Sequence, residues 1–287
     1  MHYPVMAGEV ISYLAVRPDG VYIDATAGLG GHTAAIARQL DSGRVMANDA
    51  DSESLAKARE RLEEFGGRVI YNHGRFSELG SALEESGLRP VDGLLADLGV
   101  SYYQLTDPER GFTFTSESSL DMRLDRTRGE TASDLVNYSS ERDLSDIAFH
   151  YGEERRARKL ARAVVRARPI RNARHLANVI ESASSPAKSR LHPATRFFMA
   201  LRIVVNQELE QLDALLETLP GLVGSGGRVV FLTFHSLEDR KVKRRFRALA
   251  RDGLATVLTK RVVRPGEEET RENPPSRSAK LRALEMK

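Results

Sequence analysis

The chain has 287 residues, 41% hydrophobic and 29% charged, which is the balance of an ordinary globular protein with room for one large domain or two smaller ones. Its formal net charge is only +3 and it has no cysteine, so disulfides, thiolate metal sites and a cysteine nucleophile are excluded. No segment approaches the roughly 18 apolar residues of a membrane span and the N-terminus lacks a secretory signal pattern, so we expect a cytoplasmic protein with no membrane partner.

The first hundred residues alternate between short apolar strands and amphipathic helices. Strands are predicted at 21–24, 44–49, 68–73 and 91–97. A helix is expected at 32–40, after the first strand, and another follows the second strand. This alternation is typical of a parallel, doubly wound sheet, so the predicted fold class is α/β with a Rossmann-like sheet.

The alternation stops after the fourth strand. Residues 105–200 show almost no strand pattern but several helix starts, with capping boxes predicted at Thr131 with Asp134 and at Ser140 with Asp143. These features indicate an inserted all-α domain.

The last third of the chain returns to the α/β pattern. One long helix is predicted from about 193 to 219, ended by Pro220 and Gly221. A fifth strand is predicted at 228–233, a basic helix follows it, and 255–259 and 281–286 are expected to form an antiparallel pair, with a mobile loop at 265–276 before the last strand. We therefore predict a discontinuous α/β domain, 1–104 with 205–287, interrupted by a helical domain at 105–204.

The turn after the first strand, DATAGLGGHT, is the main ligand signal. No Lys follows its glycines, which excludes a nucleotide-triphosphate loop, and Thr33 replaces the third glycine of a dinucleotide fingerprint. S-Adenosylmethionine fits better, because Asp24 suits its amine while Gly28 and Gly30 allow close backbone approach to its sulfonium. Asp49, at the end of the second strand, can accept both ribose hydroxyls, a need that NAD shares. A purely structural glycine turn is the simpler alternative.

Two segments concentrate positive charge. Residues 155–174 contain nine Arg or Lys and no acid, and residues 240–251 contain seven and no acid. On a helix, one face would carry Arg155, Arg158, Lys159, Arg162 and Arg166, opposite Ala157, Leu160, Ala161 and Val164. A solvated surface helix explains this pattern equally well, but an unmixed cationic face repels itself unless an anion meets it. We therefore predict RNA contacts here and at Lys241 and Arg244 of the second segment.

The fourth strand ends in Asp97, within LLADLGVSYYQL. Ligands of open α/β sheets bind at the carboxyl ends of strands, so Asp97 should face the methyl donor and is the first catalytic candidate. Amino-methyltransferases of nucleobases place an acid or amide before Pro-Pro-aromatic at this point; here the acid stays, the prolines are lost, and Tyr102 or Tyr103 could supply a stacking ring. The lack of cysteine excludes C5 methylation of pyrimidines, leaving an exocyclic amine, a ring nitrogen or a hydroxyl.

The segment FHSLEDR follows the fifth strand. Its Ser, His and Asp are too close in sequence to converge as a catalytic triad, so Ser236 with Asp239 is predicted to form a helix capping box. His235 should point toward the cleft and is the second catalytic candidate. The seven histidines are scattered without an H-x-x-x-H motif or carboxylate pairing, so no metal site is expected.

Over essentially its full length the chain resembles the bacterial MraW (RsmH) family of small-subunit rRNA methyltransferases. The matching segments, in this order, are HYPV, DATAGLGGHT, DLGVS, ERGFTF, LDMRLD, YGEE, HPATRFFMALRIVVNQEL, FHSLEDRKVK and NPPSRSAKLR. The resemblance implies a class I methyltransferase sheet with an inserted helical substrate domain. It also implies methyl transfer from S-adenosylmethionine to N4 of a decoding-centre cytidine, with 16S rRNA in or near the assembled small ribosomal subunit as the partner.

The resemblance also implies a set of donor contacts: Gly30, Gly31, His32, Asp49, Phe76, Asp97 and Gln104. The sequence departs from the family pattern at Tyr102, Thr106, Met199 and Pro275, where Ser, Asp, Gln and Arg are usual. These departures touch the acceptor side or packing. Two rival functions remain: a non-catalytic RNA-binding protein that keeps an inactive cofactor fold, and a small-molecule methyltransferase. The basic segments weigh against the second, and the intact series of acids and glycines weighs against the first.

Overall fold

The structure is a computed structural model that describes residues 4–184 and 192–287. The chain divides into two compact units. The first, called the sheet unit here, consists of Met1–Gly99 and Leu209–Lys287, and the second, called the helical unit, of Val100–Glu208. Each unit has its own hydrophobic core.

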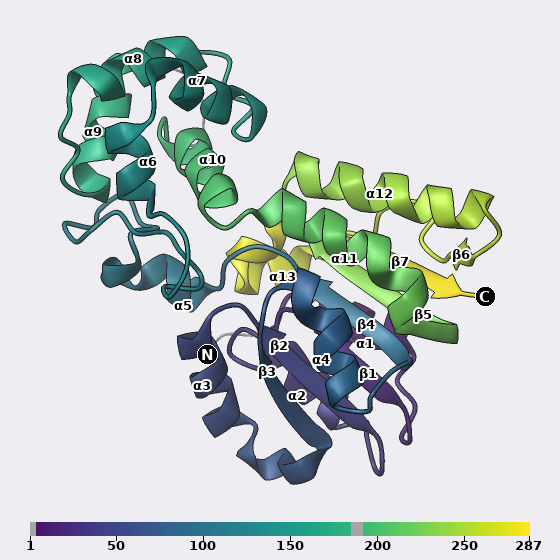
Figure 1. The fold of residues 1–287 in the computed structure, drawn as a ribbon. Coiled ribbons are helices and arrows are strands. Elements are labelled where there is room, and N and C mark those ends of the chain that lie inside the picture. The colour runs from purple at the N-terminus through teal and green to yellow at the C-terminus, as the bar shows by residue number, and fades with distance from the viewer. Residues whose placement is uncertain (1–3, 185–191) are drawn as a thin grey trace. The chain divides into compact units, whose positions relative to one another are not determined.

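A seven-stranded sheet organises the sheet unit (Figure 1). Its strands are β1 (Val21–Asp24), β2 (Arg44–Asp49), β3 (Val69–His73), β4 (Val91–Asp97), β5 (Val223–Thr233), β6 (Ala255–Val257) and β7 (Lys280–Met286). Their order across the sheet is β3-β2-β1-β4-β5-β7-β6. The first five strands are parallel, whereas β7 pairs antiparallel with both β5 and β6. The predicted α/β fold class and the antiparallel tail are thereby confirmed.

Helices cover both faces of this sheet, as a buried parallel sheet requires. One face packs against α1 (Ala7–Leu14), α2 (Gly31–Ala37) and α3 (Ser52–Arg61), and the other against α4 (Leu79–Glu85), α11 (Glu208–Leu222) and α12 (Ser236–Arg251). The shorter elements of this unit are η1 (Glu63–Arg68), η2 (Phe76–Glu78), α13 (Glu267–Glu272) and η4 (Pro274–Ser278). Helices α1 and α4 were not predicted from the sequence.

The helical unit is built from short helices around a separate apolar cluster. Its elements are α5 (Tyr102–Thr106), η3 (Pro108–Arg110), α6 (Ala132–Tyr138), α7 (Glu141–His150), α8 (Ala157–Arg166), α9 (Ala173–Ala183) and α10 (Thr195–Val205). The capping box of Thr131 with Asp134 is confirmed, whereas at Ser140 only the N-cap half is present, with its hydroxyl accepting the N–H of Asp143. Among the described residues, no helix is both long and apolar enough to cross a membrane.

The prediction of one helix from 193 to 219 is wrong. The chain breaks at Asn206 and Gln207, and Gln207 has a left-handed φ of 53° that no helix interior accommodates. The side chain of Asn206 holds the break, since its Oδ1 accepts the N–H of Leu124 at 2.7 Å and its Nδ2 donates to the carbonyl of Met122 at 2.8 Å. The apolar stripe that looked continuous therefore divides, with α10 in the core of the helical unit and α11 in that of the sheet unit.

The predicted stop at Pro220 and Gly221 is also wrong, because α11 continues to Leu222. Proline lacks an N–H and so leaves the carbonyl of Leu216, four residues earlier, without its helical donor. Arg245 of α12 supplies the missing donor through Nε at 2.9 Å. A contact from a distant part of the sequence therefore lets proline remain in the last turn.

The segment expected to be a mobile loop at 265–276 forms two short helical elements instead, α13 and the start of η4. A side chain fixes it to the N-terminal part of the chain: Glu269 Oε1 accepts the N–H of Met6 at 2.7 Å. The partner lies more than 260 residues away in the sequence, so no local pattern could have indicated this contact.

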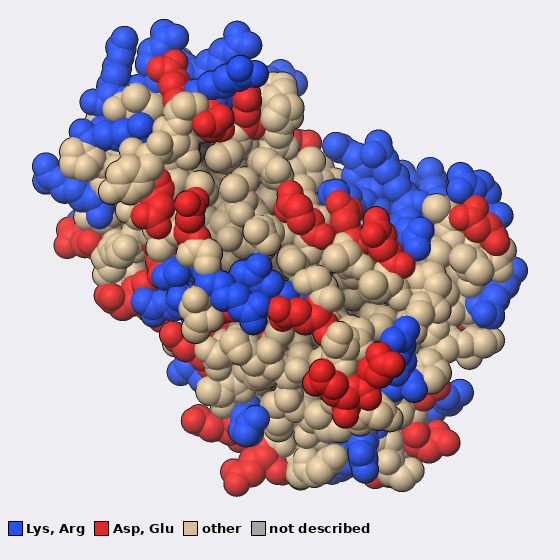
Figure 2. Space-filling view, in the orientation of Figure 1, with Lys and Arg blue, Asp and Glu red and all other residues tan. Residues whose placement is uncertain are grey.

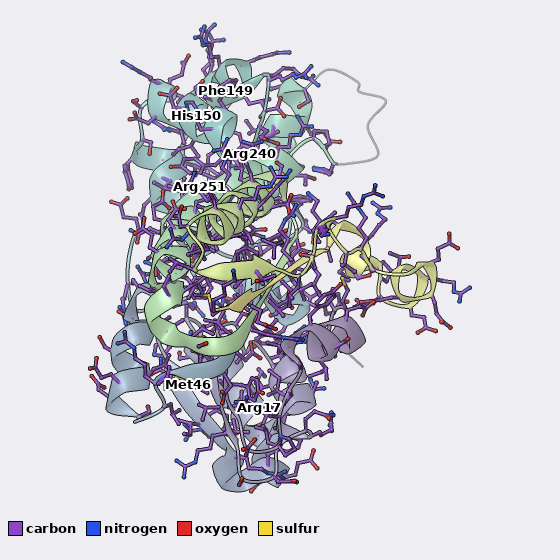
Figure 3. All side chains as sticks on the ribbon, turned by 90° about the vertical axis from the view of Figure 1, so that its right-hand side faces the viewer. Arg17, Met46, Phe149, His150, Arg240 and Arg251 are labelled. Atoms are coloured by element: carbon purple, nitrogen blue, oxygen red, sulfur yellow. The ribbon has the colours of Figure 1, made fainter. Side chains whose placement is uncertain are left out.

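The basic helix predicted after the fifth strand is α12. Figure 2 shows Lys and Arg atoms gathered over this helix, and Figure 3 labels Arg240 in its first half and Arg251 at its last residue. Its buried side, with Val242, Phe246 and Leu249, packs on the sheet.

Candidate active site

Three carboxylates mark one edge of the sheet. Asp24, Asp49 and Asp97 are the last residues of β1, β2 and β4, which are parallel neighbours. The carboxyl ends of parallel strands meet at the same edge, so the fold gathers residues that are up to 73 positions apart.

Asp24 lies at the centre of this edge and has no exposed surface. Its Oδ2 accepts the Thr33 hydroxyl at 2.7 Å, and its Oδ1 accepts the N–H of Thr26 at 3.2 Å. Burial raises the pKa of this carboxyl, against the opposing effects of His32 and of both hydrogen bonds. The geometry therefore supports a role in bracing the glycine turn, and direct contact of Asp24 with a donor amine stays a prediction.

The glycine turn is held against the end of β2. Gly28 and Gly30 have left-handed φ angles of 52° and 80°, which side chains rarely adopt. The N–H of Gly28 donates to Asp49 Oδ2 at 2.7 Å, and a Cβ on Gly30 would lie 2.9 Å from Leu62 Cδ1. Both glycines are therefore required by the backbone path.

Asp49 is half-buried and also accepts the N–H of Asp51 at 2.8 Å through Oδ1. Burial raises the pKa of Asp49 to about 6, although its hydrogen bonds with Asp51 and Gly28 oppose the shift. A carboxylate oxygen can accept two hydrogen bonds, and each oxygen of Asp49 accepts one from the backbone. Asp49 can therefore also accept ligand hydroxyls on its exposed side.

Asp97 and His32 form the second polar group of the edge. His32 is 5% exposed, and its Nε2 lies 3.5 Å from Asp97 Oδ2. Burial lowers the pKa of His32, but Asp97, Asp24 and Glu269 raise it by more, so the net shift is upward. Asp97 Oδ1 and both ring nitrogens of His32 are buried without a hydrogen-bond partner among the described residues. Unsatisfied buried polar atoms at a strand end indicate a ligand site.

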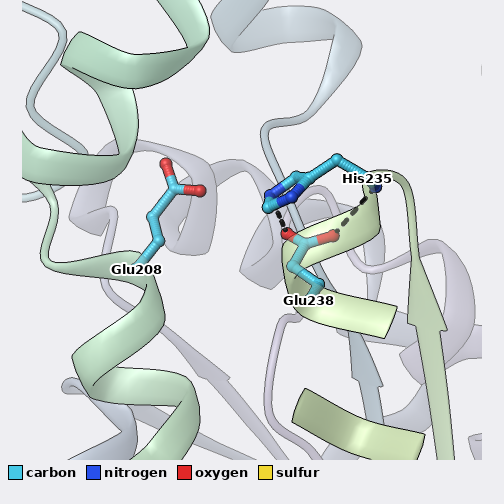
Figure 4. A group of neighbouring side chains, drawn as sticks. All are labelled: Glu208, His235 and Glu238. Atoms are coloured by element: carbon cyan, nitrogen blue, oxygen red, sulfur yellow. Dashed lines mark hydrogen bonds and ion pairs between the residues drawn. The ribbon is translucent and has the colours of Figure 1, made fainter. Parts of the chain in front are cut away.

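His235 follows β5, whose end pairs with that of β4. Its Nε2 lies 3.0 Å from Oε1 of the buried Glu238, as Figure 4 shows. Glu238 Oε2 also accepts the N–H groups of Phe234 and His235. The predicted capping box of Ser236 with Asp239 is therefore wrong: His235 is the N-cap of α12 and Glu238 completes the box.

The expectation that no histidine pairs with a carboxylate is wrong as well, given His235 with Glu238 and His32 with Asp97. Glu208, also drawn in Figure 4, belongs to the helical unit, where it binds Arg202 through two hydrogen bonds. Each of these carboxylates therefore has a cationic or histidine partner in the chain.

The remaining donor candidates fall in different places. Gly31 begins α2, and Phe76 lies in η2, just beyond the carboxyl end of β3. Gln104 belongs to the helical unit, where its Oε1 accepts the N–H of Ser101, so its part in donor binding stays a prediction. Tyr102, a candidate stacking ring in the same helix, is 55% exposed.

The amphipathic pattern of α8 is present in the structure. Ala157, Leu160, Ala161 and Val164 are buried, and the predicted cations are exposed: Arg155, Arg158, Lys159, Arg162 and Arg166. Arg155 precedes the helix rather than belonging to it, and Arg162 Nε lies 3.2 Å from Glu141 Oε1. On α12, Lys241 forms an ion pair with Asp213 and Arg244 is exposed. Contact of any of these residues with RNA stays a prediction.

Sequence reasoning passed over several residues that build the edge. The Thr26 hydroxyl accepts the N–H of Asp97 at 2.6 Å and so connects the glycine turn to β4. Thr33 occupies the third glycine position of a dinucleotide fingerprint, and its hydroxyl donates to Asp24. Glu238 lies three residues after His235, and this i, i+3 spacing was the signal that could have revealed the pair.

These observations fit S-adenosylmethionine. Asp49 would hold the ribose hydroxyls, and the left-handed glycines let the donor approach the backbone. The unsatisfied atoms of His32 and Asp97 provide polar contacts at the same edge. The turn offers neither the Lys of a triphosphate site nor a third glycine for a pyrophosphate.

Comparison with known proteins agrees with this geometry. The model of the MraW methylase family matches residues 1–287. A ribosomal RNA small subunit methyltransferase H from Solibacter usitatus is 55% identical over 287 residues, covering 100% of both chains. The protein of the same name from Acidobacterium capsulatum is 48% identical, covering 100% of this chain and 98% of its own. A Clostridium thermocellum crystal structure, provisionally assigned as an rRNA methylase, has a TM-score of 0.50 at 11% identity, covering 100% of this chain and 98% of that one.

The strand order, the acid-ended strands and the glycine turn define a class I methyltransferase, whose methyl donor is S-adenosylmethionine. Within that class, the chain belongs to the MraW methylase family.

Replacing Asp49 with Ala is expected to weaken S-adenosylmethionine binding by about 10- to 150-fold, because losing hydrogen bonds to a charged acceptor costs roughly 1.5–3 kcal/mol. Calorimetry measures this directly. Asp92→Ala is the matched control: Asp92 lies near the amino end of β4 and accepts the N–H of Val21 at 2.8 Å, so its loss also removes a backbone contact. Equal weakening in both variants, or tighter binding of NAD than of S-adenosylmethionine by the wild type, would contradict the assignment.

The raised pKa of Asp49 predicts a pH dependence of donor binding. Above about pH 6 the carboxylate is ionised and accepts hydroxyls, whereas below it the proton removes that acceptor. At pH 5 about a tenth of Asp49 would be ionised, so the affinity should fall about tenfold relative to pH 7. In the ligand-free protein, pH acts on stability in the opposite direction. Because folding raises the pKa of Asp49, ionising this carboxyl disfavours the folded state, so its contribution to the free energy of unfolding declines as the pH rises from 3.8 to about 6. Calorimetry from pH 5 to 8 should show the tenfold change in the wild type and a flat profile in Asp49→Asn.

Proposed function

We propose that this protein transfers a methyl group from S-adenosylmethionine to N4 of a decoding-centre cytidine of 16S rRNA, in or near the assembled small ribosomal subunit in the cytoplasm. One observation carries the chemistry: Asp97 Oδ1, at the carboxyl end of β4, is buried without a hydrogen-bond partner among the described residues. The family and the relatives named as small-subunit rRNA methyltransferases support an RNA substrate.

A cytosine amine needs help to react, because its lone pair is delocalised into the ring. Attack requires N4 to pyramidalise, and an acceptor for one of its N–H groups favours this and stabilises the developing positive charge. Asp97 Oδ1 is that acceptor in the proposed mechanism, with the Leu98 carbonyl as a second. When bound, the donor would supply the methyl group: the N4–C bond would form as the C–S bond breaks, the sulfur would leave as a neutral thioether, and N4 would lose one proton to solvent.

His32 positions Asp97 for this role. Its Nε2, 3.5 Å from Oδ2, interacts with one carboxylate oxygen and leaves Oδ1 for the substrate. Thr26 fixes the backbone at the same point by accepting the N–H of Asp97. The carboxylate is therefore pre-oriented before substrate arrives, and alignment of the methyl carbon with N4 supplies much of the remaining rate.

Mass spectrometry of rRNA nucleosides tests the proposal. A strain lacking this protein should lose N4-methylated cytidine at one position of 16S rRNA, and the purified protein should restore it in vitro. Comparing naked 16S rRNA with small subunits as substrates defines the partner. If the deletion strain kept the wild-type methylation pattern, the protein would instead be a non-catalytic RNA-binding protein with an inactive cofactor fold. If it methylated a free nucleoside as fast as rRNA, it would be a small-molecule methyltransferase.

A further inference from the structure

Helix α12 divides its cations between two sides. On one side, Lys241 forms an ion pair with Asp213 of α11, and Arg245 donates to two backbone carbonyls of α11. Lys243 and Arg247 are one turn apart and share a different side. Neither forms an ion pair or hydrogen bond with any residue in 4–184 or 192–287. Within these ranges both cations are therefore free of ion pairs, although Lys243 acts electrostatically on Asp239.

Lys243 and Arg247 line a recess of about 300 Å³, counted with its open mouth, between α12 and the segment around β6 and β7. Apolar side chains of Phe246 and Val257 contribute to the lining, and Lys260 adds a third uncommitted cation. Arg282 of β7 is the fourth cation, and none of the lining residues is acidic.

Asp239, the ion-pair partner of the lining residue Arg282, is already neutralised. Arg282 donates to it through Nε at 2.6 Å and Nη2 at 3.2 Å, and Lys280 Nζ lies 3.8 Å away. Burial raises the pKa of Asp239, but Arg282, Lys280 and Lys243 lower it by more, so it stays ionised as the partner of β7. Among the described residues, Lys243, Arg247 and Lys260 therefore form no ion pair.

We propose that this recess is a binding notch for one phosphate of an RNA backbone, held by Lys243, Arg247 and Lys260. Cations gathered around a concave site repel one another unless an anion meets them. Arg282, which also lines the recess, keeps Nη1 outside its two hydrogen bonds with Asp239 and offers a further donor. The part of the recess open to a water-sized sphere is about 40 Å³, well below the roughly 300–1,000 Å³ of small-molecule pockets, and its charged side chains are all positive, which suits a phosphate group better than a whole nucleotide.

The surroundings favour a polyanion over a free ion. Arg244 and Arg251 of α12 are also exposed, and Figure 2 shows Lys and Arg side chains gathered over this helix. The proposal rests on the proposed function only in taking RNA as the partner. Lys241 was predicted to contact RNA, but its ammonium is paired with Asp213. The phosphate contact is therefore assigned to Lys243 and Arg247, on another side of the same helix.

The test compares two full-length triple variants with equal loss of charge. One carries Lys243→Gln, Arg247→Gln and Lys260→Gln; the control carries Arg38→Gln, Arg44→Gln and Arg61→Gln, which are exposed on the same unit. Affinity for purified 16S rRNA is measured against salt concentration, without turnover. Loss of one phosphate contact should reduce the log–log slope by about 0.7–0.9 and weaken binding roughly 5- to 10-fold at about 0.1 M salt in the first variant. S-Adenosylmethionine affinity should stay unchanged in both.

An equal decrease of slope in both variants would overturn the notch, because it would reflect net charge alone. An unchanged slope in the first variant, with wild-type RNA binding intact, would overturn the notch and leave the proposed function standing. Conversely, a reduced slope in an enzyme that fails to methylate cytidine would support the notch and remove the proposed function. Poly-glutamate serves as the probe for an acidic protein partner, and loss of its binding without loss of RNA binding would overturn the assignment to RNA.

Discussion

Asp97→Ala is expected to reduce the rate of methyl transfer to near background, on the order of 10³-fold or more. Preorganised groups aimed at developing charge are worth about 10²–10³ each, and Asp97 Oδ1 also orients the amine. Because Asp97 is also a candidate donor contact, the measurement must be a single-turnover rate at saturating S-adenosylmethionine. The loss then reports on chemistry rather than on donor binding.

Two further variants sharpen this result. Asp97→Asn should keep a small fraction of the rate, because an amide oxygen still accepts a hydrogen bond. Asp92→Ala, near the other end of the same strand, should keep the wild-type rate at saturating donor. A near-normal rate for Asp97→Ala would move the role elsewhere, with His235 next, because it follows the neighbouring strand β5.

Neutralising α8 is expected to have the second-largest effect. Replacing Arg155, Arg158, Arg162 and Arg166 with Gln should reduce the slope of log affinity for RNA against log salt by about 3 units, if all four contact phosphates. At about 0.1 M salt this corresponds to a loss of about 10²–10³-fold in affinity. Gln preserves helix propensity and the buried side is untouched, so the helical unit should stay folded.

Arg162 sets the lower limit of that effect. Arg162 contacts Glu141, but an ion pair between exposed side chains is weak, so Arg162 can leave it for a phosphate. If Arg162 stays with Glu141, only three arginines contact phosphates and the slope should fall by about 2 units. The control with equal charge loss replaces Arg38, Arg44, Lys57 and Arg61 in the sheet unit with Gln. An unchanged slope in the α8 variant would show that its cations form only a solvated surface.

The sequence by itself determined the features that depend on neighbouring residues. Alternation of apolar runs with turn residues located the parallel strands, because a strand buried on both faces must be apolar along its length. The glycines of the DATAGLGGHT turn were expected to bring the backbone close to a ligand, and Gly28 and Gly30 do have the left-handed φ angles that favour glycine, while donor binding by the turn stays a prediction. The amphipathic pattern of α8 was likewise readable, since helical period and burial coincide.

Tertiary structure alone decided the features whose partners are distant in the sequence. The break after α10 depends on Asn206 bonding to a loop 82 residues earlier, and Pro220 remains helical because Arg245 satisfies a carbonyl 29 residues away. The cations of α12 looked alike in the sequence, yet Lys241 is paired with α11 while Lys243 is not. Hydrogen bonds and ion pairs between segments are set by three-dimensional proximity, which residue spacing does not encode, and they determine which polar groups remain available for ligands.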